Sequence, residues 1–220
     1  MTHLDELESQ SIYLMREAFH GFQKPAMLWS MGKDSNVLLW LAKKAFCGHM
    51  PFPVVHIDTT YEFPEMLEFR AWAQKHYGFE LTVWINKEAR ARGIGYETTD
   101  PVTVTHELKT VALQQCLAAN GYDALITGIR RDQTATRTAT RVVDYDETTG
   151  IIKISPLADW TEEEVWSYIV AFGVPYNSLH DDGYPSIGCA PCTRRPAAGA
   201  DPRSGRWDGF AKTECGLHRA

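Results

Sequence analysis

The chain has 220 residues, of which 44% are hydrophobic and 23% are charged, and its formal net charge is −6 at pH 7. This composition is typical of a folded globular protein and excludes a disordered or fibrous chain. The acidic balance argues against nonspecific coating of nucleic acid, which requires clustered Lys and Arg. Residues 186–220 nevertheless carry six Lys or Arg against three acidic residues, so a local basic site is allowed.

No run of 18 or more apolar residues occurs, and the first ten residues, MTHLDELESQ, are acidic where a secretory signal is basic and then apolar. We therefore expect a cytoplasmic protein without a membrane partner.

Strand and helix patterns alternate along most of the chain. Strands are predicted at residues 25–29, 52–58, 79–86, 124–128 and 150–157, and helices at 4–22, 36–46, 62–78, 104–121 and 159–173. Glycines at 21, 121 and 173 are placed to end three helices, and Thr161 with Glu164 has the spacing of a capping box. The alternation predicts an α/β fold whose five-stranded, mostly parallel sheet is covered by helices on both faces.

Three stretches have no such pattern. Residues 86–101 lack periodicity, and residues 129–146 are rich in Thr and Arg, which favours an active-site loop. From Pro175 onward Gly, Pro and Arg dominate. We expect an α/β domain at residues 1–174 and an irregular, cysteine-containing extension at 175–220.

A polar junction, Ser-Met-Gly-Lys-Asp-Ser at residues 30–35, separates the first strand from the next helix. A helix start offers free amide groups and the positive end of a dipole, which together bind phosphate. Lys33 adds a positive charge, and the serines add hydroxyl donors. The Walker A spacing is absent. The junction predicts a phosphate site made by Ser30, Gly32, Lys33, Asp34 and Ser35, with an unliganded polar turn as the alternative.

This junction resembles the PP-loop of the ATP pyrophosphatase superfamily, whose pattern is Ser-Gly-Gly-x-Asp-Ser. Met31 stands in place of the first Gly, as a bulkier residue does in the small catalytic subunit of bacterial sulfate adenylyltransferase. Similarity to that subunit covers about residues 24–141. The resemblance implies an adenine nucleotide α-hydrolase-like fold. It also implies binding of ATP with Mg²⁺ and cleavage between the α and β phosphates, with charge neutralisation as the main catalytic requirement.

Asp58 ends the second predicted strand and Thr59 follows it, at the edge where open α/β sheets bind ligands. The resemblance implies that they lie near the nucleotide. A compatible alternative is that Asp58 or Thr60 caps the next helix.

Gly128 follows the fourth strand, where the lack of a side chain allows close approach of another group. Arg130, Arg131 and Arg137 come next and offer bidentate contacts to phosphate or sulfate. We predict that these four residues bind the nucleotide; a solvated surface loop is the alternative.

Three of the five cysteines, Cys189, Cys192 and Cys215, fall in the last 32 residues. An odd number of cysteines without a secretory signal argues against a disulfide framework, and the clustering predicts metal or redox chemistry. Cys116 lies within a predicted helix and is expected to be a small core residue.

Residues 159–218 resemble the tail of assimilatory sulfonucleotide reductases, members of the phosphoadenosine phosphosulfate (PAPS) reductase family. The resemblance implies that Cys215 attacks the sulfate sulfur, and that Cys189 and Cys192 supply half the ligands of an iron–sulfur cluster. The other half is a Cys–Cys pair near the place where this chain has Val104 and Thr105, so the four-cysteine arrangement is not expected. Those reductases generally lack the loop lysine that this chain retains.

Four functions remain open. The first is ATP cleavage with Lys33 and Arg130 as catalytic groups, coupled to sulfur transfer through a Cys215 persulfide or a three-cysteine cluster; nucleic-acid thiolation, such as DNA phosphorothioation, belongs here. The second is thiol-dependent reduction of an adenylylated sulfate. The third is a sulfate adenylyltransferase subunit with a GTPase partner. The fourth is a nucleotide-binding module with zinc held by the three cysteines and His218. The expected partners are an adenine nucleotide, a sulfur donor such as a cysteine desulfurase or a thioredoxin-like reductant, and further copies of the chain.

Overall fold

The computed structural model describes residues 2–147 and 149–207, in which strands and helices alternate. The strands are β1 (Pro25–Leu28), β2 (Val54–Ile57), β3 (Leu81–Trp84), β4 (Ala124–Ile126), β5 (Val143–Asp146) and β6 (Ile151–Ile154). The α-helices are α1 (His3–Gly21), α2 (Lys33–Ala45), α3 (Pro64–Tyr77), α4 (Lys87–Ala91), α5 (Pro101–Thr105), α6 (Ala112–Asn120) and α7 (Glu162–Phe172). A π-helical turn, His106–Val111, joins α5 to α6, and 3₁₀ turns lie at Arg131–Gln133, Ala135–Arg137, Ser178–His180 and Ala190–Cys192.

The six strands form one sheet in the order β3-β2-β1-β4-β6-β5, with all neighbours parallel except β5 and β6. The prediction of a mostly parallel sheet is confirmed, but the predicted number of five strands is wrong. The sixth strand, β5, lies within the segment expected to be an active-site loop. It is an edge strand whose Val143 and Tyr145 are exposed, so its sequence lacks the apolar signal of the buried strands.

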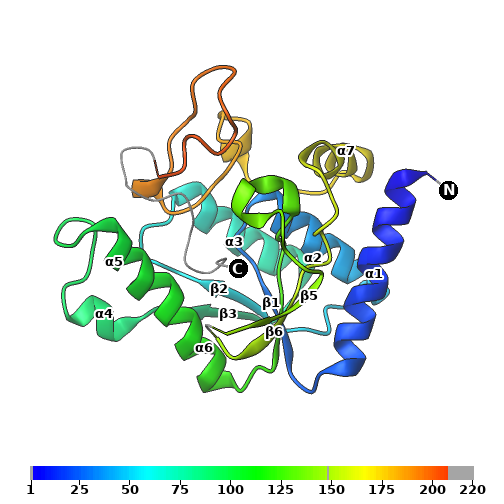
Figure 1. Cartoon of the computed structure of the whole chain (residues 1–220), viewed down its shortest axis with the longest axis horizontal. Helices are drawn as coiled ribbons and strands as arrows, with labels where there is room; N and C mark the ends of the chain where they lie inside the picture. Colours follow the sequence, from blue (N-terminus) through cyan, green and yellow to red (C-terminus); the bar gives the residue numbers. More distant parts are fainter. Residues whose placement is uncertain (1, 148, 208–220) are drawn as a thin grey trace.

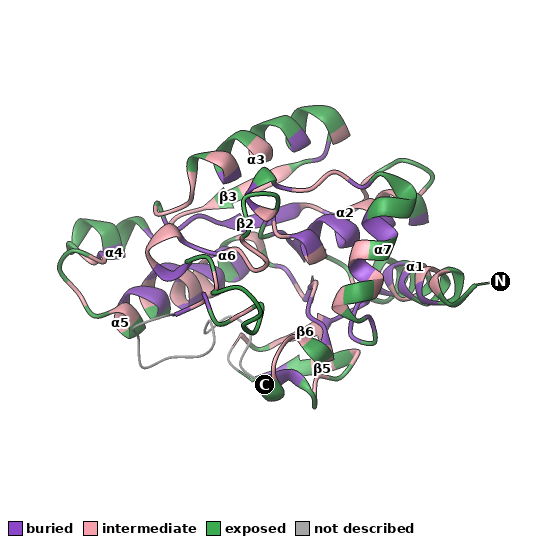
Figure 2. Cartoon of the chain, turned by 90° about the horizontal axis from the view of Figure 1, so that it is seen from above, coloured by how far each residue is buried: buried purple, intermediate pink, exposed green. Residues whose placement is uncertain are grey.

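Helices cover both faces of the sheet, as predicted (Figure 1). Successive strand residues point to opposite faces, so Met27 packs in one core with α1, α2, α3 and α7, whereas Ala26 and Leu28 pack in a second core with α6. Figure 2 shows the central strands and most of α2 as buried, with exposed residues on the outer surfaces of α1, α3 and α4. No helix among the described residues is both long and apolar enough to cross a membrane.

Local signals fix most helix ends. Thr161 and Glu164 form the predicted capping box of α7, and Gly121 and Gly173 adopt left-handed conformations just after α6 and α7. Helix α1 ends at Gly21 itself, with Phe22 as its C-terminal cap.

The carboxyl ends of the parallel strands meet at one edge of the sheet. The chain leaves β1 toward β2 on one side and leaves β4 toward the β5–β6 pair on the other, so a topological switch point lies between β1 and β4, where α/β sheets bind ligands. The segment after α7 returns across this edge (Figure 1). The fold thus places the 30–35 junction, the turn after β4 and the extension in one region.

Candidate active site

A cavity with about 1200 Å³ of empty space, its open mouth included, lies at this edge. It is lined by eight of the predicted residues: Ser30, Gly32, Lys33, Asp34, Ser35, Gly128, Arg130 and Arg137. The structure does not bring Asp58, Thr59, Arg131, Cys189 or Cys192 to its walls, and Cys215 and His218 lie outside the described residues.

The junction after β1 turns sharply into α2. Met31 adopts a left-handed conformation with φ of 62°, at the position where the PP-loop pattern has Gly, and its side chain is fully buried in the main core. Such a φ costs roughly 1 kcal/mol or more for a non-glycine residue, so burial of the side chain offsets local strain. Gly32 caps α2 without a side-chain hydrogen bond, and the Ser35 hydroxyl donates to its carbonyl at 2.9 Å. Residues 32–35 line the cavity, so the start of α2 forms part of its wall.

Gly128 lies against this first turn. A Cβ atom built at Gly128 would lie 3.3 Å from the Ser35 nitrogen and 3.4 Å from the Asp34 carbonyl carbon. The turn after β4 thus packs closely on the start of α2, which explains the glycine.

Two buried cations and two carboxylates form a network on the cavity wall. The Lys33 Nζ lies 3.5 Å from Glu162 and 3.8 Å from Asp34. Arg130, only 1% exposed, pairs with Asp34 and lies 3.6 Å from Glu162. Burial lowers the pKa of Lys33 to about 8, against the opposing effect of Glu162. Lys33 is therefore charged at pH 7 and loses its charge at mildly alkaline pH.

Glu162 is a site residue that the sequence analysis missed. It is the first residue of α7, where an acid is expected simply to favour the helix dipole. Its distance to Lys33 depends on a fold contact across 129 positions, 162 minus 33, and no local pattern could reveal it.

His180 is a second missed residue and joins the extension to α2. Its Nδ1 lies 2.8 Å from the Tyr184 carbonyl, which can only accept, so Nδ1 carries the proton and Nε2 accepts from the Lys33 amide at 3.2 Å. Burial and the charge of Lys33 lower the pKa of His180 to about 4. A neutral imidazole thus occupies one of the free amides of α2.

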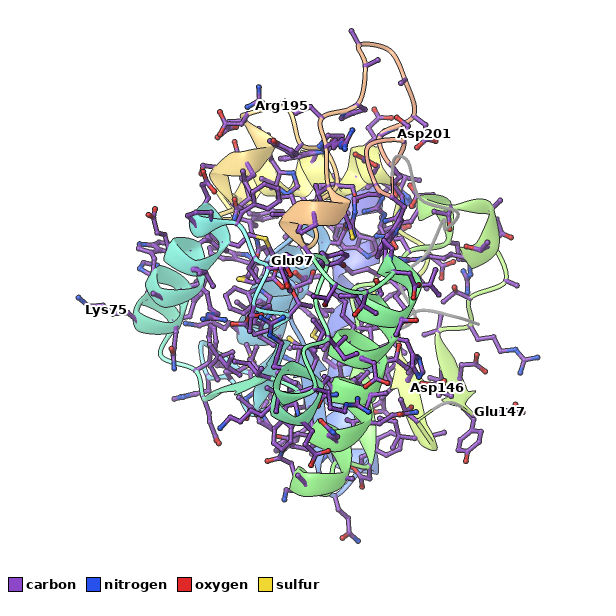
Figure 3. The ribbon with its side chains drawn as sticks, turned by 90° about the vertical axis from the view of Figure 1, so that its left-hand side faces the viewer. Lys75, Glu97, Asp146, Glu147, Arg195 and Asp201 are labelled. Atoms are coloured by element: carbon purple, nitrogen blue, oxygen red, sulfur yellow. The ribbon has the colours of Figure 1, made fainter. Side chains whose placement is uncertain are left out.

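The extension supplies more of the wall. The Pro185 carbonyl accepts from the Lys33 Nζ at 2.9 Å, and Arg203 and Arg206 line the cavity. Arg206 donates to the Ile187 carbonyl at 2.7 Å. Arg195 and Asp201 lie at the outer end of this segment, away from the sheet (Figure 3).

The arginines after β4 separate into two groups. Arg137 is buried and contacts Gln133, which also holds Asp34 at 3.2 Å, so it belongs to the cavity network. Arg131 instead donates to the Thr140 carbonyl and pairs with Asp159. It fixes the loop after β4 and does not face the cavity.

Asp58 and Thr59 shape the turn after β2. The Asp58 carboxylate accepts from the Thr60 amide at 2.8 Å and from Arg70 at 2.7 Å. These bonds hold its pKa below the ordinary value although burial opposes them. Helix α3 is capped by Phe63, so the alternative that Asp58 or Thr60 caps it is wrong. Pro64 at the first helical position sets that start instead.

The two described tail cysteines lie behind the cavity wall. Cys189 and Cys192 are buried, and the Cys192 thiol donates to the Tyr96 hydroxyl at 2.9 Å. Burial raises the pKa of Cys192 to about 11. Tyr96 also hydrogen-bonds Thr105, one of the two residues near the place where the resemblance implies a Cys–Cys pair. A phenol contacts the Cys192 thiol, and neither Val104 nor Thr105 can supply a thiolate ligand, so the described residues do not fit a four-cysteine cluster.

Cys116 is fully buried in the α6 core, as predicted. Burial raises the pKa of its thiol to about 11, which makes it an inert packing residue.

The chain is similar to known proteins along most of its length. Residues 24–195 match the sequence profile of the phosphoadenosine phosphosulfate reductase domain. The chain is 41% identical over 190 residues to an adenosine 5'-phosphosulfate reductase of Rhodococcus erythropolis, covering 84% of this chain and 75% of that protein. It is 39% identical over 202 residues to sulfate adenylyltransferase subunit 2 of Rhodopseudomonas palustris, covering 81% of this chain and 62% of that protein.

Among solved structures, a phosphoadenylyl-sulfate reductase from Candida auris in complex with phosphate superposes with a TM-score of 0.73. Its sequence is 27% identical, and the match covers 87% of this chain and 96% of that one. The expected fold is thereby confirmed.

Proposed function

Because this chain belongs to the phosphoadenosine phosphosulfate reductase domain family of enzymes, we propose that it transfers an adenylyl group between pyrophosphate and an oxyanion, cleaving ATP between its α and β phosphates. The observation that carries the proposal is the convergence of Lys33, Arg130 and the N-terminal turn of α2 on one cavity. All three stabilise a leaving pyrophosphate.

The site suits positioning and charge neutralisation. An oxygen of the acceptor attacks the α-phosphorus, the bond from that phosphorus to the bridging oxygen breaks, and its electron pair leaves with pyrophosphate. Lys33 and Arg130 face the accumulating negative charge, while Ser30 and Ser35 offer hydroxyl donors. Mg²⁺ would enter with the nucleotide as the counter-ion of its phosphates.

The acceptor proposed is sulfate. One relative is named as a sulfate adenylyltransferase subunit, which supports this choice and also suggests a partner subunit. Arg137, Arg203 and Arg206 add cationic groups to the cavity beyond the loop, where a second anion would bind.

A second candidate is thiol-dependent release of sulfite from an adenylylated sulfate. The relative named as a reductase and the wall built by residues 185–188, just before Cys189, favour it. In that reaction the Cys215 thiolate attacks sulfur and the nucleotide leaves; a second thiol, from a thioredoxin-like reductant, then attacks the Cys215 sulfur and releases sulfite. Sulfur transfer from a desulfurase to another acceptor, nucleic acid included, is the third.

The experiment measures pyrophosphate release from ATP and Mg²⁺ with sulfate, and sulfite release from adenylyl sulfate with a thiol. The variant Lys33→Met should lower pyrophosphate release at least 100-fold because it removes a preorganised charge. Lys75→Ala, on the exposed side of α3 and pointing away from the molecule (Figure 3), is the matched control and should leave the rate unchanged. If the protein releases sulfite in a reaction that requires Cys215, and releases no pyrophosphate from ATP, the second candidate function is the correct one.

A further inference from the structure

A second polar cluster lies beside the cavity, at the end of β2. Ligand atoms of His56, Asp58 and Glu62 lie within 4.8 Å of one another. Two ligands on opposite sides of a bound divalent ion are about 4 Å apart, so these three side chains are close to coordination distance.

The His56 imidazole directs a ring nitrogen toward the Asp58 and Glu62 carboxylates. It is 3% exposed, and its Nδ1 lies 3.1 Å from the Trp29 carbonyl. That carbonyl can only accept, so Nδ1 carries the proton and Nε2 presents a lone pair. Among the described residues Nε2 has no hydrogen-bond partner, although it is buried. An unsatisfied buried acceptor beside two carboxylates is costly unless a cation binds there.

A supporting hydrogen bond also fixes the orientation of each of the three side chains. Trp29 holds His56, Arg70 and the Thr60 amide hold Asp58, and the Thr59 hydroxyl holds Glu62 at 2.9 Å. Such supporting hydrogen bonds are typical of metal ligands, where they fix the histidine tautomer and the carboxylate geometry.

The geometry points to a divalent transition-metal site, for Mn²⁺ or Zn²⁺, formed by the His56 Nε2 and the Asp58 and Glu62 carboxylates. The nitrogen ligand favours these ions over Mg²⁺, which prefers oxygen ligands and bound water. His56 and Glu62 line the main cavity, so an ion has an entry path. Three protein ligands leave coordination positions open toward that cavity.

The site does not depend on ATP cleavage, since the ion is bound by the chain alone. The test titrates Mn²⁺ into the nucleotide-free full-length protein and follows free Mn²⁺ by electron paramagnetic resonance. One ion should bind per chain. His56→Gln and Glu62→Gln should each weaken binding at least tenfold. His49→Gln, at an exposed histidine, should bind as the wild type does.

Two further measurements separate the outcomes. A triple Cys→Ser variant at 189, 192 and 215 should bind Mn²⁺ unchanged; loss of the ion there would assign it to the tail and overturn the site. Circular dichroism checks that each variant folds. If His56→Gln does not fold, Glu62→Gln alone tests the metal site. Unchanged Mn²⁺ affinity in both ligand variants, or an effect of His56→Gln on ATP affinity alone, would refute the metal site.

Discussion

Removal of the Glu162 charge should shift the alkaline limit of activity. At 3.5 Å two unit charges interact by about 1.2 kcal/mol in a water-like dielectric, which suits Glu162 because 34% of its side chain is exposed. This energy corresponds to about one pKa unit. Glu162 raises the pKa of Lys33, so Glu162→Gln should lower it from about 8 to about 7.

The assay is kcat/KM for pyrophosphate release from pH 6 to pH 9.5, which reports the ionisations of the free enzyme. In the wild type the rate should fall as pH rises through about 8, because Lys33 loses its charge. In Glu162→Gln the fall should begin about one unit lower. Glu163→Gln removes an exposed acid from the same turn of α7 and should leave the profile in place. An unmoved profile in Glu162→Gln, or an equal shift in both variants, would refute the role given to Glu162.

The free energy of unfolding should fall by up to about 3 kcal/mol as pH drops from 6.5 to 4, because His180 takes up its proton at a higher pH in the unfolded chain than in the folded protein. Chemical denaturation of His180→Gln should show a smaller fall over the same pH range. An equal pH dependence of the two unfolding free energies would contradict this. Met31→Gly relieves a positive φ worth roughly 1 kcal/mol but removes a fully buried side chain worth about 2–5 kcal/mol, so urea unfolding should show net destabilisation, and a gain in stability would count against it. Gly128→Ala should push the first turn of α2 and lower kcat/KM for ATP roughly tenfold with little loss of stability, whereas unchanged kinetics would show that the turn tolerates the methyl group.

The sequence predicts the sheet and the phosphate loop well because both depend on local patterns. Short, mostly apolar runs of three or four residues mark the buried strands β1, β2 and β4, and the polar junction between an apolar strand and an apolar helix marks the loop. Strand β5 was not predicted because its sequence alternates Val, Asp, Tyr and Asp at the edge of the sheet. Its apolar residues are exposed, so no buried apolar face marks it as a strand.

The directions of the side chains do not follow from the sequence pattern. Position after a strand predicts which edge a residue occupies, yet Arg131 turns toward a loop residue, Asp159, and Asp58 turns toward α3, whereas Arg130 turns into the cavity. Glu162 and His180 act through contacts with Lys33 that only the folded chain creates. In the sequence Glu162 is one of several acids at the start of a helix, and His180 is a single histidine in an irregular segment. Neither position forms a sequence pattern that predicts these contacts.

Adenylyl sulfate offers the most direct test, because the two leading reactions break different bonds of one molecule. With pyrophosphate and Mg²⁺, attack on phosphorus yields ATP and sulfate. With thiols, attack on sulfur releases AMP and leaves an S-sulfonate, from which a second thiol releases sulfite as the two thiols form a disulfide. The Lys33 and Arg130 site predicts that the purified protein forms ATP from adenylyl sulfate and pyrophosphate, and that Lys33→Met abolishes this. Sulfite as the sole product, at a rate unchanged in Lys33→Met and lost in Cys215→Ser, would contradict it.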